Sequence, residues 1–71
     1  MDESAPTKRQ LDAQRASPAR RRLRAIEGQV RGLVPMIDED RPCLDMLVQI
    51  AAAQEALSQV NKLVMRTFLE N

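Results

Sequence analysis

Two stretches of the chain repeat apolar residues with helical spacing, and a short polar segment separates them. In the first stretch, large apolar side chains recur at spacings of three, four, three and four residues: Leu23, Ile26, Val30, Leu33 and Ile37. This spacing places them along one side of a helix that packs lengthwise on other helices. We predict a first helix over about 18–38.

Local signals mark the ends of this helix. Ser17 followed by Pro18 is typical of a helix start, because a hydroxyl caps free amides and proline fits the first helical position. Pro35 breaks the pattern, since a proline inside a helix removes a hydrogen bond and collides with the preceding turn. We expect either a bend near Gly32 and Leu33 or an irregular last turn, and the sequence leaves both open.

The second stretch follows Arg41-Pro42, which repeats the start signal, and no later glycine or proline interrupts it. Its apolar positions are Leu44, Met46, Leu47, Ile50, Ala51, Ala53, Leu57, Val60, Leu63, Val64 and Phe68. They cover a wider face than a two-stranded seam needs, which is typical of a helix in a bundle. We predict a second helix over about 41–69. The expected fold class is all-α, an antiparallel helical hairpin that dimerises into a four-helix bundle.

Length and composition favour pairing between copies. The chain has 71 residues, with Phe68 as its only aromatic side chain, and such a chain is near the lower limit for burying its own core. We expect a flexible N-terminal arm over 1–16 and one helical-hairpin domain over 17–71. We also expect a homodimer or homotetramer.

Charge is unevenly distributed, although the net charge is only +1. Residues 18–37 hold one acid, Glu27, and five basic residues, and three acids follow at 38–40. The basic residues are Arg20, Arg21, Arg22, Arg24 and Arg31. This sign change predicts a basic surface and a separate acidic corner.

Helical geometry groups some of these arginines. At about 100° per residue, Arg20, Arg24 and Arg31 fall within about 40° of one another, away from the apolar seam. Arg21 lies to one side of them, and Arg22 flanks the seam on the opposite side. Such a row suits the phosphates of a nucleic acid. A solvated face, paired with Glu27 and with acids of a neighbouring subunit, is equally consistent with the composition.

Other classes of protein are disfavoured. The single cysteine, Cys43, excludes an internal disulfide framework. No apolar run approaches the ~18 residues of a membrane-spanning helix, and the first residues lack the pattern of a secretory leader. We therefore expect a cytoplasmic protein with no membrane partner. We do not expect an enzyme, because histidine, a glycine-rich phosphate loop and an evident acid–base pair are all missing.

Three motifs carry a more specific signal. They are Arg22-Leu23-Arg24-Ala25-Ile26-Glu27-Gly28-Gln29-Val30-Arg31-Gly32, Glu39-Asp40-Arg41-Pro42-Cys43 and Gln49-Ile50-Ala51-Ala52. In this combination the chain resembles, over about residues 20–70, the bacterial copper-sensitive operon repressor family, which also includes nickel/cobalt, formaldehyde and persulfide sensors. The resemblance implies an all-helical dimer of dimers. It also implies that basic surfaces bind operator DNA and that an inducer at the cysteine releases it.

The resemblance assigns roles to individual residues. It implies that Arg22 and Arg24 bind DNA and that Cys43 senses the inducer. In the family's copper sensors, a histidine and a second cysteine follow at positions that correspond here to Phe68 and to the position after Asn71. The Cu(I) ligand set is therefore expected to be incomplete, with Cys43 as its single matched metal ligand.

Cys43 leaves several interpretations open. It could be a small core residue on an apolar face, or a Cu(I) ligand completed by the soft thioether of Met46 or of Met65 from another subunit. A formaldehyde sensor would pair the thiol with an N-terminal proline, whereas this chain begins Met1-Asp2. A persulfide or oxidation sensor would lack a resolving cysteine within the chain.

The sequence therefore predicts a DNA-binding transcriptional repressor. Operator DNA is the expected partner, and Cu(I) at Cys43 is the cofactor that the resemblance suggests. The alternative belongs to another class: a helical oligomerisation or co-repressor subunit that has lost both sensing and DNA binding.

Overall fold

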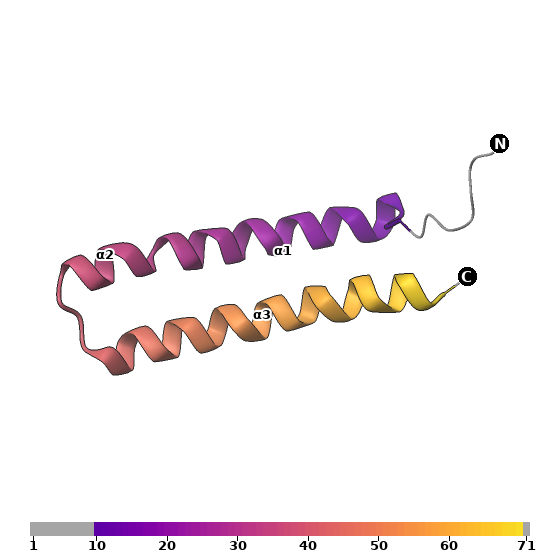
Figure 1. Cartoon of the computed structure of the whole chain (residues 1–71). Helices are drawn as coiled ribbons and strands as arrows, with labels where there is room; N and C mark the ends of the chain where they lie inside the picture. The colour runs from indigo at the N-terminus through magenta and orange to yellow at the C-terminus, as the bar shows by residue number, and fades with distance from the viewer. Residues whose placement is uncertain (1–9, 71) are drawn as a thin grey trace.

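The computed structural model describes residues 10–70, which form three helices. Helix α1 spans Ala13–Arg31, α2 spans Leu33–Asp38 and α3 spans Cys43–Leu69. Helices α1 and α2 run one after the other in nearly the same direction, and α3 returns antiparallel beside them (Figure 1). The described residues contain no strand. The predicted all-α helical hairpin is confirmed.

The predicted start of the first helix is wrong, because α1 begins at Ala13 rather than near Pro18. The cap is Asp12, whose carboxylate accepts a hydrogen bond from the Arg15 amide at 2.9 Å. Pro18 lies inside the helix, where it removes the hydrogen bond to the carbonyl four residues earlier and crowds that carbonyl. The last residues of the predicted arm, 13–16, are therefore helical, and residues 1–9 of that arm lie outside the described part.

The first helical stretch breaks at Gly32, between α1 and α2. Pro35 has no amide to bond the Arg31 carbonyl, as a continuous helix would require. Gly32 keeps a helical conformation, and its amide bonds the Gly28 carbonyl at 3.0 Å. Of the two outcomes considered for Pro35, the structure shows a local interruption near Gly32 and Leu33.

The turn after α2 depends on Asp40, which has a left-handed backbone with a φ of 54°. The Arg41 amide bonds the Met36 carbonyl at 3.0 Å, and the Asp40 amide bonds the Ile37 carbonyl at 3.1 Å. This pair of bonds is a Schellman motif, which ends a helix and satisfies its last carbonyls. Pro42 then leads into α3, which starts two residues after the predicted start and ends at the predicted end.

Arg15 joins the two chain segments at the open end of the hairpin. Its guanidinium donates to Oγ1 of Thr67 at 2.9 Å and to Oε2 of Glu70 at 3.0 Å, and it lies 2.7 Å from Oε1 of Glu70. Thr67 is buried. The hydrogen bond from Arg15 lowers the pKa of the Glu70 carboxyl. We refer to these three residues as the end clamp.

The hairpin buries few side chains by itself. Its buried apolar residues are Ala19, Ile26, Ala53 and Val60. By contrast, thirteen large apolar side chains are at least 38% exposed. The molecule measures 56 × 17 × 16 Å, and its radius of gyration is 16.6 Å, against about 11 Å for a compact chain of this length. A single hairpin therefore leaves its core incomplete.

No helix within the described residues combines the length and the apolar character needed to cross a membrane.

We predict that Asp40→Gly stabilises the protein by about 1 kcal/mol, because glycine adopts the left-handed conformation without the strain of a side chain. Asp40→Asn should stay close to the native protein, which separates the backbone effect from loss of charge. Urea unfolding at one fixed protein concentration, followed by circular dichroism, measures both changes. A less stable glycine variant would contradict this interpretation of the turn.

We predict that the end clamp weakens in acid. Because the pKa of Glu70 is lowered in the folded state, its stabilising contribution is present above the ordinary carboxyl pKa of 4.5 and is lost as the pH falls through the lowered value. The difference in melting temperature between the native protein and Glu70→Gln should therefore shrink in acid. A difference that is independent of pH would show that the ion pair does not stabilise the fold.

Candidate nucleic-acid interface and sensing cysteine

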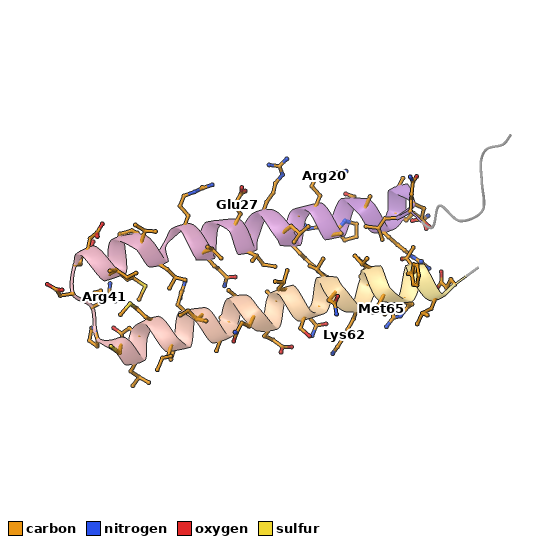
Figure 2. All side chains as sticks on the ribbon, in the orientation of Figure 1. Arg20, Glu27, Arg41, Lys62 and Met65 are labelled. Atoms are coloured by element: carbon orange, nitrogen blue, oxygen red, sulfur yellow. The ribbon has the colours of Figure 1, made fainter. Side chains whose placement is uncertain are left out.

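The five arginines predicted to bind DNA all lie on α1, and all five are exposed. Arg20 projects away from α3, as does Glu27 two turns further along the helix (Figure 2). By helical position, Arg24 and Arg31 lie on the same edge as Arg20. We call this the basic edge, which consists of Arg20, Arg24 and Arg31.

Three of the arginines gather around one surface hollow. It has a volume of about 300 Å³ and is lined by Ser17, Arg20, Arg21 and Arg24. No acid is among the lining residues. We call it the arginine hollow. Within the described residues, these three arginines form no ion pair.

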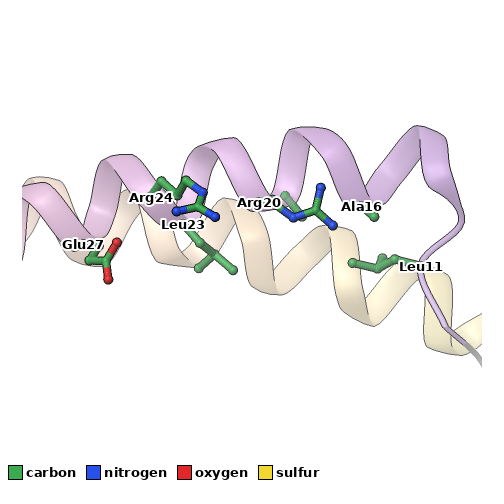
Figure 3. A pocket seen from close by; sticks show the side chains of 7 residues that line it. Leu11, Ala16, Arg20, Leu23, Arg24 and Glu27 are labelled. Atoms are coloured by element: carbon green, nitrogen blue, oxygen red, sulfur yellow. The ribbon is translucent and has the colours of Figure 1, made fainter.

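A larger, mostly apolar hollow of about 480 Å³ adjoins it on α1. The two hollows share Arg20 and Arg24, which project from one side of the helix (Figure 3). Leu11, Ala16, Ala19, Leu23 and Glu27 line the rest of the larger one. The basic edge therefore stands beside apolar surface.

Arg31 differs from the other four arginines, because it pairs with an acid. Its Nη2 lies 3.9 Å from Oε2 of Glu27, and both side chains are well exposed. An exposed pair at this distance contributes little to stability, but Glu27 places negative charge on the basic edge between Arg24 and Arg31. For the basic residues of the first helix, the sequence also allowed a solvated face paired with Glu27. In this hairpin, that interpretation describes Arg31.

By helical position, seven of the thirteen exposed large apolar side chains lie on one broad face of the hairpin. Because α1 and α3 are antiparallel, the apolar positions that lie just beside the α1–α3 contact on each helix project toward the same side of the hairpin. We call this the apolar face; it includes Leu23 and Val30 of α1, Val34 of α2, and Ile50, Leu57, Val64 and Phe68 of α3. The basic edge borders it on the outer side of α1. An exposed apolar surface of this extent is unusual in a monomer and marks an interaction site.

Cys43 is the first residue of α3, at the turn end of the hairpin, and its thiol is free and exposed. The interpretation of Cys43 as a core residue does not hold for the single hairpin. The described residues contain no group of three or more histidine, cysteine or acidic side chains that could hold a metal.

Two of the other proposed ligand positions, Met65 and Phe68, lie far from Cys43 along α3. Met65 is near the opposite end of that helix (Figure 2), about 33 Å away at 1.5 Å per residue, and Phe68 is about 38 Å away. Neither position can share an ion with Cys43 of the same subunit. Met46 is half-buried one turn from Cys43.

Comparison with known proteins places the chain among regulators of transcription. Residues 16–71 match the family model of a metal-sensitive transcriptional repressor. Over 40 residues, the chain is 55% identical to the copper-sensing transcriptional repressor RicR of Mycobacterium tuberculosis. Over 39 residues, it is 56% identical to the copper-sensing transcriptional repressor CsoR of Bacillus subtilis. A CsoR of Mycobacterium bovis is 35% identical over 49 residues.

These alignments cover 56%, 55% and 69% of this chain and 42%, 39% and 41% of the relatives. The matched part therefore spans about two fifths of each relative's length. No solved structure matches the chain.

The matched family consists of transcriptional repressors, which are not enzymes. The chain belongs to the metal-sensitive transcriptional repressor family. The resemblance inferred from the three sequence motifs is confirmed.

Two residues of the site region were not predicted from the sequence. Ser17, interpreted as a helix cap, lines the arginine hollow. Arg15, placed in the predicted arm, forms the end clamp. The spacing could have identified Ser17, because it lies three residues before Arg20 and four before Arg21. Residues separated by three or four positions are neighbours on a helix surface.

Proposed function

We propose that this protein is a cytoplasmic repressor that binds operator DNA through α1 arginines contributed by several subunits, and that an inducer acting at Cys43 releases the DNA. The arginines are Arg20, Arg21, Arg22, Arg24 and Arg31. The observation that carries the proposal is an exposed row of arginines beside an apolar face, in a member of a repressor family; of the five, only Arg31 pairs with a described acid.

Charge and chemistry support contact with the DNA backbone. Arginine forms paired hydrogen bonds with phosphate oxygens and stays charged at every physiological pH. The protein has no separate recognition helix among its described elements. Binding is therefore expected to rest on phosphate contacts, which position a protein on the duplex and depend strongly on salt.

The apolar face supports assembly from identical copies. The face extends along a molecule 56 Å long and 17 Å wide. The area of such a face is comparable with the ~800 Å² that each partner buries in a stable interface. Two hairpins packed through these faces form a four-helix bundle, and two such dimers form the proposed tetramer. Each added subunit brings another basic edge to the assembly.

Release by an inducer requires communication between two separate places. Cys43 lies beyond the end of α2, and α1–α2 extends about 21 Å from Arg24 to Asp38. An inducer at Cys43 therefore acts by changing the arrangement of subunits, not by displacing DNA directly. The two places are coupled if the assembly has two states and the inducer binds one of them better.

Cu(I) is the inducer that the copper-sensing relatives suggest. The Cys43 thiolate is one suitable soft ligand. Because Met65 and Phe68 of the same subunit are more than ~30 Å away along α3, further donors must come from the nearby Met46 or from another subunit. Phe68 offers no donor, so the proposed copper site differs from a complete thiolate–imidazole–thiolate set.

The alternative is an oligomerisation or co-repressor subunit without DNA binding. The observation that favours it is the phenylalanine at position 68, where the resemblance implies a metal-binding histidine. The experiment below separates the two functions.

We predict that the protein binds its own upstream intergenic duplex, and that log affinity falls with log salt by about 0.9 per phosphate contacted. Fluorescence anisotropy across a salt series measures this. Arg20→Ala with Arg24→Ala should abolish binding while leaving the oligomer intact on size exclusion. Failure of the native protein to bind would favour the co-repressor alternative.

The same assay tests the inducer. Cu(I) should release DNA from the native protein but not from Cys43→Ser. If Cu(I) has no effect on either, the repressor proposal stands and copper is excluded as the inducer.

A further inference from the structure

The first turn of α1 is weakly secured by the helix itself. Pro18 has no amide to bond the Gln14 carbonyl, and its ring crowds that carbonyl. The turn is therefore joined to the rest of α1 by one hydrogen bond fewer than in a continuous helix. None of residues 10–17 is buried, and the buried residues of α1 are Ala19 and Ile26. Because one helical turn rarely persists alone in water, a contact with another part of the molecule must hold it.

The end clamp supplies that contact. The Arg15 guanidinium meets the Glu70 carboxylate through two atom pairs, Nη1 with Oε1 at 2.7 Å and Nη2 with Oε2 at 3.0 Å. Paired contacts of this kind are the strongest that these two groups form. Nη1 also donates to Oγ1 of Thr67 at 2.9 Å, and that hydroxyl donates in turn to the Leu63 carbonyl at 3.0 Å. Arg15 therefore ties the first turn of α1 to the end of α3.

The charges around the clamp make the contact depend on both of its partners. The hydrogen bond from Arg15 lowers the pKa of the Glu70 carboxyl, and the charge of Arg66 lowers it further. Partial desolvation and the nearby negative charge of Asp12 raise that pKa. Arg15 thus stands between two carboxylates, those of Asp12 and Glu70, which repel each other. Without either charge of the Arg15–Glu70 pair, nothing in the clamp draws the first turn toward α3 as strongly.

The first turn also closes one end of the mostly apolar hollow of about 480 Å³ on α1. Leu11, just before α1, and Ala16, in its first turn, line this hollow (Figure 3). Arg20 and Arg24 line it further along the helix, whereas Thr67 and Glu70 do not line it. A movement of the first turn therefore changes the shape of the hollow.

We propose that the end clamp is a latch, which holds residues 11–17 against α3, and that on its release this turn opens as a unit about Pro18 while the rest of the hairpin stays folded. The end of α3 thereby controls the shape of a hollow that it does not line. The latch requires neither DNA nor Cu(I), so it goes beyond the proposed function.

Hydrogen exchange of the full chain at neutral pH, followed by NMR, tests the latch amide by amide, because a local opening exposes only its own amides. Glu70→Gln should speed exchange of the Ala16 and Ser17 amides about 10-fold, from the loss of charge-assisted hydrogen bonds. The matched control is Glu55→Gln, which removes the same charge from an exposed position of α3 where the carboxylate bonds Gln59 of the same helix. Exchange in the control should stay within about twofold of the native rate.

A variant in the body of the hairpin shows whether the turn opens separately. Val60→Ala weakens the buried contact between the helices, so the Ile26 amide in the middle of α1 should exchange about 10-fold faster. The Ala16 and Ser17 amides should keep their native rates, since the body stays folded when the turn opens. Low concentrations of urea on the native protein should give the same contrast, because a small opening exposes little surface.

Pro18→Ala tests the position of the hinge. Alanine supplies the amide that bonds the Gln14 carbonyl and favours the helix, so α1 itself then holds its first turn. In this background, Glu70→Gln should speed exchange of the Ala16 and Ser17 amides by less than about threefold, as expected when two substitutions act on one element.

The outcomes decide for or against the latch. Faster exchange of Ala16 and Ser17 in Glu70→Gln, combined with native rates in Val60→Ala, would support it. Equal acceleration of Ala16 and Ile26 in Val60→Ala, or in urea, would show that the turn opens only when the whole hairpin unfolds and would overturn the latch. Native rates in Glu70→Gln would also overturn it. None of these results bears on the repressor proposal, because they are measured without DNA.

Discussion

The packing of α1 against α3 is the contact on which everything else depends, and it is narrow. Among the described residues, its buried apolar side chains are only Ala19, Ile26, Ala53 and Val60. Burial of this kind contributes roughly 25 cal/mol per Å² of apolar surface, so four such residues give little surplus over the conformational entropy of ordering two helices. The end clamp and the Schellman turn hold the two ends of the hairpin. The remaining apolar surface is left for another copy.

This constraint also organises the proposed function. The apolar face and the basic edge are neighbouring strips on α1, so packing through the face fixes where the arginines stand in the assembly. Cys43 lies at the turn end, remote from those arginines. Subunit packing is therefore the physical link that can carry a change at Cys43 to the DNA-binding surface.

Periodicity predicted the helices well, because an amphipathic repeat reports directly on packing. Local signals were less reliable. Asp12 and Ser17 are both good capping residues, and the structure uses the first, so the start of α1 was placed too late. The effect of Pro35 on the first helix could not be predicted from the sequence, because a helix that lacks one hydrogen bond can either bend or break. The structure shows a break at Gly32, where the backbone stays nearly helical.

The candidate site was predicted only in part. The helical wheel grouped Arg20, Arg24 and Arg31 by angle, but distance along the axis and the carboxylate of Glu27 separate Arg31 from the rest. Arg21 was judged peripheral by angle, yet it lines the hollow because it is one turn from Ser17 and Arg24. For Cys43, the predicted helix over about 41–69 already implied that Met65 and Phe68 lie far along it, but the sequence did not show that the thiol is exposed.

The most direct test of the account is the assembly state of the native protein in solution. Sedimentation velocity, combined with thermal unfolding across a wide range of protein concentrations, measures it. We expect a dimer or tetramer whose melting temperature rises with protein concentration, because association and folding are linked. A monomer that unfolds cooperatively at a temperature independent of concentration would contradict it, since the hairpin would then be stable with its apolar face uncovered.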